Sequence, residues 1–393
     1  MSRPDDSLSR MLRGATNVVS EKELKDKLSK GRPLRVKLGV DPTAPDIHLG
    51  HTVVLTKLRT FQDLGHTVVF IIGDFTAAIG DPSGRDSTRP PLSEAIINEN
   101  IQTYTDQVFK VLDKEKTEVR YNGEWLYDLF DRRNPAFMPR TILRNHTVQQ
   151  LMERDDFAQR RKAGLPISML ELMYPLFQGY DSVAVKADVE LGGHDQLFNL
   201  LMGRQMQKDA GQEPQVVMTL PLLEGLDGTR KMSKTYGNHV GVKDVENDMF
   251  GKIMSISDDL MWKYYELLTE ETVADVKKLH PMEAKKKLAG ILVARFHGQT
   301  AAKSAADHFA NVFSKKENPD EMEQFRLTGK EMDAIDLIVA AQLAPSKKEA
   351  RRLVEQGGVQ LDGRRVNVGE KISVSGPGVL KVGKRRFKKL IPA

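Results

Sequence analysis

The chain has 393 residues, of which 59 are Lys or Arg and 54 are Asp or Glu, for a formal net charge of +5. This length is enough for roughly two or three domains with cores of their own. Cysteine is absent, which excludes disulfides, thiolate zinc sites, iron–sulfur clusters and cysteine nucleophiles. No apolar run is long enough for a membrane span, and the first ten residues lack the apolar core of a secretory signal. We therefore expect no membrane partner and a cytoplasmic location.

The excess of positive charge is confined to the last part of the chain. Residues 331–393 hold 13 Lys and Arg against 7 Asp and Glu, so the preceding residues are close to neutral as a group. A neutral body followed by a basic segment favours a polyanionic partner that binds to that segment.

The first elements predict a parallel sheet covered by helices. Ser20 and Glu23 form a capping-box pattern at the start of a short helix. The periodicity that follows predicts a strand at 34–40, a helix at 48–64 and a second strand at 67–72. Strand, helix and strand within about forty residues make a βαβ unit, which implies parallel strands.

The remaining pattern mixes helices with short strands. Helices are predicted at 92–112, 153–163, 168–178 and 194–210, and strands near 183–189 and 215–220. The pattern is helical from 244 to 315, with a strong helix-forming run at 284–309. A polar, proline-containing break at 315–319 predicts a linker. Beyond it we expect helices at 334–343 and 346–356 and short strands within 357–363 and at 366–368, 371–374 and 379–382.

His48-Leu-Gly-His51 is the first motif that can carry chemistry. The common Gly-rich phosphate loops are absent, so a bound nucleotide requires another device. This motif opens a predicted helix, where free N–H groups and the helix dipole attract anions. His48 and His51 share one face, and Gly50 lets a flat ring approach the backbone. The alternatives are two solvated histidines, or a metal pair, for which no third ligand stands at a suitable spacing.

The second motif is Lys231-Met-Ser-Lys-Thr235. Gly228 and Gly237 flank it, which is typical of a mobile loop, and its lysines could hold a triphosphate as point charges. A solvated basic turn is the alternative. The two motifs together resemble the HIGH and KMSKS motifs of the class I aminoacyl-tRNA synthetases.

Further segments narrow the resemblance to the tyrosyl-tRNA synthetases. They are Gly80-Asp-Pro-Ser-Gly-Arg85, Tyr174 with Gln178-Gly-Tyr-Asp181, and Gly192-Gly-His-Asp-Gln196. Segment 346–363 resembles the small RNA-binding module named after the ribosomal small-subunit protein S4. The resemblance covers roughly residues 30–393, in the order of the family, and is closest to bacterial members.

The resemblance implies an architecture, a reaction and partners. It implies an α/β fold in which a helical extension at 1–33 precedes a Rossmann-like catalytic domain at 34–235. A helical domain at 236–325 and an S4-like domain at 331–393 would follow. The implied reaction activates L-tyrosine with ATP to tyrosyl-adenylate and transfers it to tRNA(Tyr). Family members are homodimers, and Mg²⁺ would accompany ATP without a dedicated protein metal site.

The resemblance also implies site residues. The catalytic residues would be Thr43, His48, His51, Lys231 and Lys234. The ATP site would comprise Gly39, Asp41, His48, Gly50, His51, Gly193, Asp195, Lys231, Ser233 and Lys234. Tyrosine would contact Thr76, Asp81, Tyr174, Gln178, Asp181 and Gln196, with Asp81 at the ammonium and Asp181 at the phenolic hydroxyl. Phosphate or tRNA contacts would come from Arg85, Arg89, Lys347, Lys348, Arg351 and Arg352.

Lys37 departs from the pattern of well-known members, which have a tyrosine there, two residues before Gly39. A subgroup of bacterial members resembles this chain in having lysine. Two alternatives follow: Lys37 neutralises Asp181, or it faces elsewhere and Asp181 acts alone. Thr235 in place of the motif's serine keeps the hydroxyl.

Three other functions fit part of the pattern. Tryptophanyl-tRNA synthetase shares the fold and both motifs, but the blocks at 80–85 and 192–196 and the RNA-binding tail favour tyrosine. A non-catalytic RNA-binding protein on a synthetase scaffold would be free to lose the motif residues, which are intact here. A small-molecule nucleotidyltransferase would need neither the second motif nor a basic tail.

Overall fold

The computed structural model describes residues 4–43, 45–81, 94–131, 133, 137–311, 322–329, 331–383 and 386–392. Within these ranges the chain folds as two compact units, Met1–Ala305 and Ala306–Ala393, each with a sheet of its own. No helix in the described ranges is long and apolar enough to cross a membrane.

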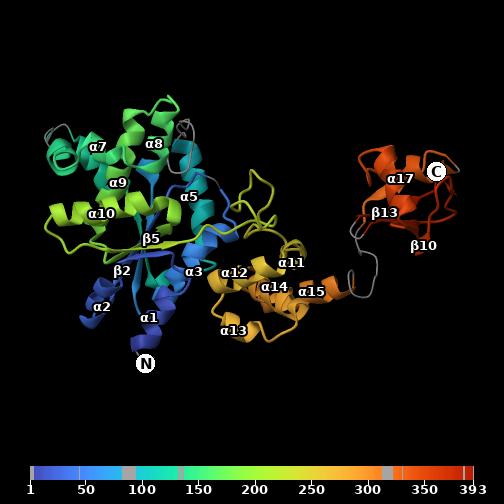
Figure 1. Cartoon of the computed structure of the whole chain (residues 1–393), viewed down its shortest axis with the longest axis horizontal. Helices are drawn as coiled ribbons and strands as arrows, with labels where there is room; N and C mark the ends of the chain where they lie inside the picture. The colour runs from blue at the N-terminus through green and yellow to red at the C-terminus, as the bar shows by residue number, and fades with distance from the viewer. Residues whose placement is uncertain are drawn as a thin grey trace. The chain divides into compact units, whose positions relative to one another are not determined.

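The first unit is built on a sheet with the strand order β1-β6-β5-β2-β3-β4 (Figure 1). Its strands are β1 Asn17–Val19, β2 Arg35–Val40, β3 Thr67–Ile72, β4 Thr117–Tyr121, β5 Val189–Gly193 and β6 Val216–Leu220. β1 runs antiparallel to β6, and the other neighbours are parallel. The α/β fold predicted from the sequence is confirmed.

Helices cover both faces of this sheet. The helices of this part of the chain are α1 Pro4–Leu12, α2 Glu21–Ser29, α3 Leu49–Asp63, α4 Asp74–Ile79, α5 Glu94–Val108, α6 Gly123–Leu126, α7 Val148–Leu151, α8 Asp155–Lys162, α9 Met169–Val185 and α10 Leu197–Asp209. In Figure 1, α9 and α10 lie above the sheet and α1 and α2 below it. Because both faces are covered, the interior strand β3 is a continuous apolar run, buried from Val68 to Ile72.

The order of the strands changes direction between β2 and β5. β3 and β4 follow on one side of this point, and β6 and β1 on the other. Parallel crossovers are right-handed, so the helix α3 between β2 and β3 and the helix α10 between β5 and β6 belong to opposite faces. Ligands of open parallel sheets bind at the carboxyl ends of the strands that flank such a switch point.

After β6 and the non-helical segment 221–245, the chain continues as helices. These are α11 Glu246–Met254, α12 Asp258–Leu268, α13 Val273–Val276, α14 Pro281–His297 and α15 Gln299–Phe309, and α15 runs across the boundary between the two units. The run predicted as helical at 284–309 is two helices, because Gly298 adopts a φ of 89° and ends α14. The capping box at Ser20 is confirmed: Ser20 Oγ accepts the N–H of Glu23, whose carboxylate accepts the N–H of Ser20.

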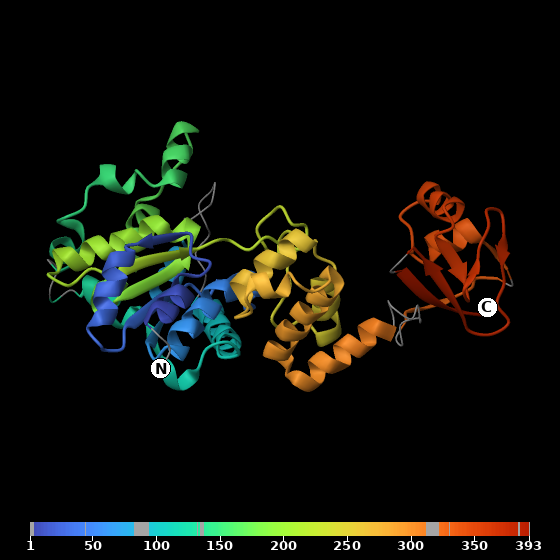
Figure 2. The same cartoon turned by 60° about the horizontal axis from the view of Figure 1, so that its bottom comes forward.

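The second unit has its own sheet, with α16 and α17 packed against it around an apolar core (Figure 2). Its helices are α16 Ala334–Ala340 and α17 Lys347–Glu355. The strand order is β10-β9-β12-β13-β7, beside a small pair of β11 and β8. The strands are β7 Gln324–Arg326, β8 Met332–Asp333, β9 Val359–Leu361, β10 Arg364–Arg365, β11 Lys371–Ile372, β12 Gly378–Val382 and β13 Arg386–Ile391.

Two strand predictions are wrong in position. The strand predicted near 183–189 begins only at Val189, because α9 continues past residue 178 to Val185 and ends where Lys186 adopts a left-handed φ of 52°. The strand predicted at 366–368 lies instead at β10, where it pairs with β9 across a tight turn. The strands β1, β4, β7 and β8 have no counterpart among the sequence predictions.

Candidate active site

A cavity of about 560 Å³ lies at the carboxyl ends of β2 and β5. All of the catalytic, ATP-site and tyrosine-site candidates from the sequence line it: Gly39, Asp41, Thr43, His48, Gly50, His51, Thr76, Asp81, Tyr174, Gln178, Asp181, Gly193, Asp195, Gln196, Lys231, Ser233 and Lys234. The position is the switch point of the sheet, where this fold class binds ligands.

His48 and His51 form a reciprocal cap at the start of α3. His48 Nδ1 accepts the N–H of Gly50 at 3.1 Å, and His51 Nδ1 accepts the N–H of His48 at 3.1 Å. Burial lowers the pKa of His48 to about 2 and the pKa of His51 to about 4. Both rings are therefore neutral at neutral pH, and each carries its proton on Nε2, from which it can be donated to an anion.

Gly50 is required by this cap. A Cβ atom there would lie 2.9 Å from the ring of His48, closer than a side chain can approach. From the sequence, Gly50 is expected to leave room for a flat ligand ring to approach the backbone. The structure adds a contact within the protein that also needs glycine.

The second motif lies across the cavity and is joined to the first by an ion pair. Lys234 Nζ lies 2.7 Å from Oδ2 of Asp46, and Lys243 Nζ lies 3.3 Å from its Oδ1. These lysines hold the pKa of Asp46 below its ordinary value. Asp46 stands two residues before His48, and no pattern in the sequence predicts its contact with Lys234.

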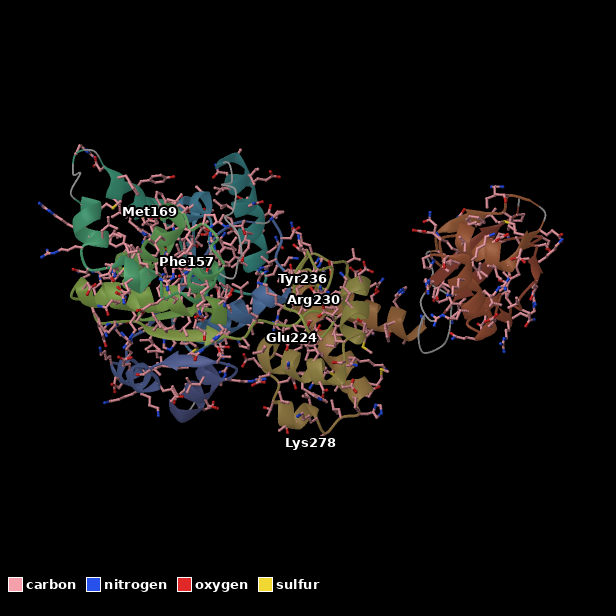
Figure 3. The ribbon with its side chains drawn as sticks, turned by 45° about the horizontal axis from the view of Figure 1, so that its top comes forward. Phe157, Met169, Glu224, Arg230, Tyr236 and Lys278 are labelled. Atoms are coloured by element: carbon pink, nitrogen blue, oxygen red, sulfur yellow. The ribbon has the colours of Figure 1, made fainter. Side chains whose placement is uncertain are left out.

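The loop that carries the second motif is folded on itself. The N–H of Ser233 donates to Asn238 Oδ1 at 2.8 Å, and Asn238 Nδ2 donates to Asp227 Oδ2 at 2.9 Å. The Arg230 guanidinium lies over the ring of Tyr236, 4.9 Å from its centre. Figure 3 labels both residues, in the same region as Glu224. These contacts hold the lysines of the motif at the cavity.

Asp41 directly follows β2 and accepts hydrogen bonds from two residues that are expected to contact the tyrosine substrate. Its Oδ2 accepts the hydroxyl of Tyr174 at 2.8 Å and its Oδ1 accepts the hydroxyl of Thr76 at 2.6 Å. Burial raises the pKa of Asp41 to about 7, although the Thr76 hydrogen bond opposes the shift. A Cβ atom at Gly73 would lie 2.1 Å from the Asp41 carboxylate, so glycine is needed for this contact.

Three side-chain amides, those of Gln178, Gln196 and Asn199, are joined by hydrogen bonds at the cavity. Gln196 Nε2 donates to Asp81 Oδ2 at 2.9 Å. Asn199 Nδ2 donates to the side-chain oxygens of Gln178, at 2.9 Å, and Gln196, at 3.1 Å. Asn199 thus orients both glutamines, and it stands three residues after Gln196 on α10, a helical spacing visible in the sequence.

Asp181 lies at the buried end of the cavity. Trp125 Nε1 donates to its Oδ1 at 2.8 Å, and Asn122 Nδ2 approaches its Oδ2 at 3.4 Å. Burial raises the pKa of Asp181 to about 7. Asn122 directly follows β4, so the alternating segment at 117–121 was the pattern that could have placed it at the carboxyl edge of the sheet.

Lys37 does not pair with Asp181. Its Nζ lies 2.8 Å from Oε1 of Glu190, so the alternative in which Lys37 neutralises Asp181 directly is wrong, and the lysine faces a second carboxylate. The charge of Lys37 still lowers the pKa of Asp181, against the larger effect of burial.

The predicted phosphate or tRNA contacts comprise two arginines near residue 85 and four cations of the second unit. Arg85 and Arg89 fall outside the described residues. Lys347, Lys348, Arg351 and Arg352 are exposed on α17 in the second unit. Lys347 pairs with Asp336 at 2.7 Å and Arg352 pairs with Glu349 at 2.6 Å, both on the surface.

Comparison with known proteins identifies the family. Residues 29–314 match the model of tRNA synthetases class I (W and Y), and residues 335–376 match the S4 domain. A tyrosine–tRNA ligase of Thermotoga maritima is 51% identical over 395 residues, covering 98% of this chain and 97% of the relative. The tyrosine–tRNA ligase of Oleidesulfovibrio alaskensis is 50% identical over 397 residues, covering 98% and 99%. The chain belongs to the tyrosine–tRNA ligases.

Solved structures of tyrosyl-tRNA synthetases share the fold. The enzyme from Archaeoglobus fulgidus, solved with L-tyrosine, has a TM-score of 0.63 at 21% identity and covers 78% of this chain and 100% of its own. A truncated mitochondrial enzyme from Aspergillus nidulans has a TM-score of 0.65 at 20% identity, covering 78% and 94%. The fold of the first unit is therefore that of tyrosyl-tRNA synthetases.

Proposed function

We propose that this chain activates L-tyrosine with ATP to form tyrosyl-adenylate and transfers the tyrosyl group to the 3′ end of tRNA(Tyr). The observation that carries the proposal is that both motifs and the tyrosine-site candidates line one cavity. Membership of the tyrosine–tRNA ligases supports it. Tyrosine-dependent exchange of pyrophosphate into ATP tests the first step.

The phosphates of ATP are proposed to lie between the two motifs. His48 and His51 would donate from Nε2 on one side, together with Thr43, and Lys231 and Lys234 would supply positive charge on the other. The ion pair with Asp46 implies that a phosphate must replace this carboxylate at Lys234. Backbone at Gly39 and Gly50 would face the nucleotide, and Gly193, Asp195 and Ser233 would complete its site.

Tyrosine is proposed to lie in the buried part of the cavity. Its ammonium would meet Asp81, with Tyr174 and Gln178 beside it, and Gln196 would hold its carboxylate. Thr76 would line the same wall. The phenolic hydroxyl of the bound tyrosine would donate to Asp181. An amino acid without this hydroxyl would therefore leave a buried carboxylate with one partner fewer.

The chemistry requires positioning more than covalent catalysis. An oxygen of the tyrosine carboxylate attacks the α-phosphorus, and the bond to pyrophosphate breaks. Negative charge builds on the phosphate oxygens, so donors placed in advance lower the barrier. In the second step a ribose hydroxyl of the tRNA attacks the carbonyl carbon of the adenylate and AMP leaves.

Mg²⁺ is proposed to arrive on the phosphates as part of the ATP substrate. Among the residues that the structure describes, no group of three or more His, Asp or Glu side chains is arranged to hold a metal ion. Mg²⁺ commonly binds to substrate phosphates and water, with few protein ligands.

The chain is proposed to act as a homodimer in the cytoplasm, where bacterial translation takes place. Large apolar side chains are exposed in the segment from β4 to the start of α9, which includes Met169 in Figure 3. They are Tyr121, Tyr127, Phe130, Leu143, Val148, Leu165, Met169 and Leu170. A concentration of this kind favours a protein interface, and we propose a second copy of this chain as its occupant.

The four-part division at 1–33, 34–235, 236–325 and 331–393 is retained as a proposal, with tRNA bound in part by the last segment. The separate core of the second unit and the exposed cations of α17 support this role. Arg85 and Arg89 are proposed as further phosphate contacts.

Alanine at Lys347, Lys348, Arg351 and Arg352 together is expected to weaken tRNA charging and leave tyrosine-dependent exchange unchanged. Each lost phosphate contact should also reduce the slope of log affinity for tRNA against log salt by about 0.7–0.9. Charging rates and tRNA affinity at several salt concentrations measure both effects. Alanine at Lys22 and Lys25, exposed on α2, is the matched control. Charging and salt slope equal to those of the control would show that α17 does not contact tRNA.

A further inference from the structure

Lys37 lies in the middle of β2, and its side chain is 0% exposed. Its Nζ donates to Oε1 of Glu190 at 2.8 Å, to Oγ of Ser182 at 2.8 Å and to the backbone oxygen of Gln178 at 3.1 Å. An ammonium has three protons, so each has an acceptor. The lysine is therefore held in one position by β5 and α9.

Glu190 is the direct neighbour of Lys37 on β5, because the two residues are paired across the parallel strands. Its side chain is 1% exposed. Its second oxygen, Oε2, accepts the hydroxyl of Ser182 at 3.0 Å and the side-chain amide of Gln215. The ion pair is neutral as a whole and its polar atoms are bonded, as an interior ion pair requires.

The ion pair holds the turn of α9 that carries Asp181. Gln178 and Ser182 are four residues apart, so they lie on one face of the helix, one turn from each other. Asp181 belongs to the same turn and lines the cavity. Lys37 therefore acts on Asp181 in two ways, through the helix that carries it and through its charge.

We infer that the Lys37–Glu190 pair is a positioning device for tyrosine selection, which holds Asp181 from behind the cavity, with the Lys37 charge favouring the carboxylate form that accepts the tyrosine hydroxyl. The inference rests on the proposed function and adds residues outside the substrate contacts. Buried ion pairs add little net stability compared with apolar side chains of similar volume. The place of this pair, beneath the turn of Asp181, supplies a reason for keeping it.

The effect of the pair on ionisation has a definite sign. Burial raises the pKa of Asp181 to about 7, the Lys37 charge lowers it, and Glu190 raises it by less. Two groups of the ion pair face Asp181, Lys37 on β2 and Glu190 on β5. Two further titratable groups do so from the cavity, Tyr174 on α9 and Asp41 after β2. The charge of Asp81 in turn raises the pKa of Asp41. Since the ionised carboxylate accepts the hydroxyl, tyrosine use should rise with pH through this pKa. Loss of the lysine charge should move the rise to higher pH.

The test compares the wild-type chain with K37M and with K37M/E190Q. The double variant removes both charges, so it leaves no unpaired buried charge that could prevent folding. The measurement is kcat/KM for tyrosine in pyrophosphate exchange, from about pH 6 to about pH 9. In K37M the rise should move up by about one pH unit, which lowers kcat/KM roughly tenfold on its acid side. In K37M/E190Q the smaller, opposite effect of Glu190 is lost as well, so the rise should move in the same direction by less. The KM for ATP should not change.

Lys57→Met is the matched control. Lys57 is also a buried lysine, 8% exposed, but it lies on α3 and its Nζ donates to the backbone oxygen of Arg10 at 2.8 Å. The pH profile of this variant should equal that of the wild type. An unshifted profile in K37M/E190Q, or an equal shift in Lys57→Met, would overturn the inference. A wild-type chain without tyrosine-dependent exchange would instead remove the proposed function on which it rests.

Discussion

Replacing Lys234 with alanine is expected to slow tyrosine-dependent pyrophosphate exchange roughly 30-fold to 1,000-fold. Lys234 lines the same cavity as His48 and His51, and in the proposed reaction the charge of the leaving pyrophosphate develops between them. Loss of one preorganised partner of such charge costs about 2–4 kcal/mol of barrier. Since the contact forms mainly in the transition state, kcat should fall while the affinity for tyrosine changes little. Single-turnover and steady-state exchange separate the two effects.

Lys243→Ala provides the control for this variant. Lys243 pairs with the same Asp46 as Lys234 but stands outside the motif. If exchange needs a cation at the phosphates, Lys243→Ala should be close to normal and Lys234→Ala should not. Equal rates in the two variants would favour a solvated turn over a catalytic loop.

Asp181→Ala is expected to lower kcat/KM for tyrosine and leave that for phenylalanine nearly unchanged. A hydrogen bond to a charged group is worth about 1.5–3 kcal/mol, so the loss for tyrosine should be roughly 10-fold to 200-fold. For this class of enzyme, discrimination between the two amino acids is about 10⁵ without editing, a value taken over from the class. The variant should reduce that ratio by the same factor. Exchange with each amino acid as substrate measures it.

Asp188→Asn is the control for selectivity. Asp188 is also a buried carboxylate, but it pairs with Arg32 at 2.7 Å. Its loss should lower the melting temperature without changing the ratio of tyrosine to phenylalanine. If Asp181→Ala keeps the full ratio, tyrosine is selected by another group.

Much of the fold was accessible from the sequence because its pattern is local. The strand β3 is a continuous apolar run, as a covered parallel strand must be, and Ser20 with Glu23 marks the start of α2. The end of α9 was not accessible. Val183 and Val185 favour a strand by propensity, but packing of α9 against α10 keeps them helical.

The site divides in the same way. The residues of the motifs were predicted because their spacing resembles a family, and they line one cavity. Asp46, Asn122 and Glu190 were missed, because each acts through a partner distant in the sequence: Lys234, Asp181 and Lys37. Neither partner in such a pair identifies the other until the sheet brings them together.

Pyrophosphate exchange into ATP, measured with each of the standard amino acids in turn, tests the central claim most directly. The reverse reaction returns labelled pyrophosphate to ATP only when a cognate adenylate forms, so the assay reports the first step without tRNA. We predict exchange with tyrosine and little with phenylalanine, because Asp181, which lines the cavity, is proposed to accept the hydroxyl that phenylalanine lacks. Exchange driven by tryptophan in place of tyrosine, or by no amino acid, would contradict the account.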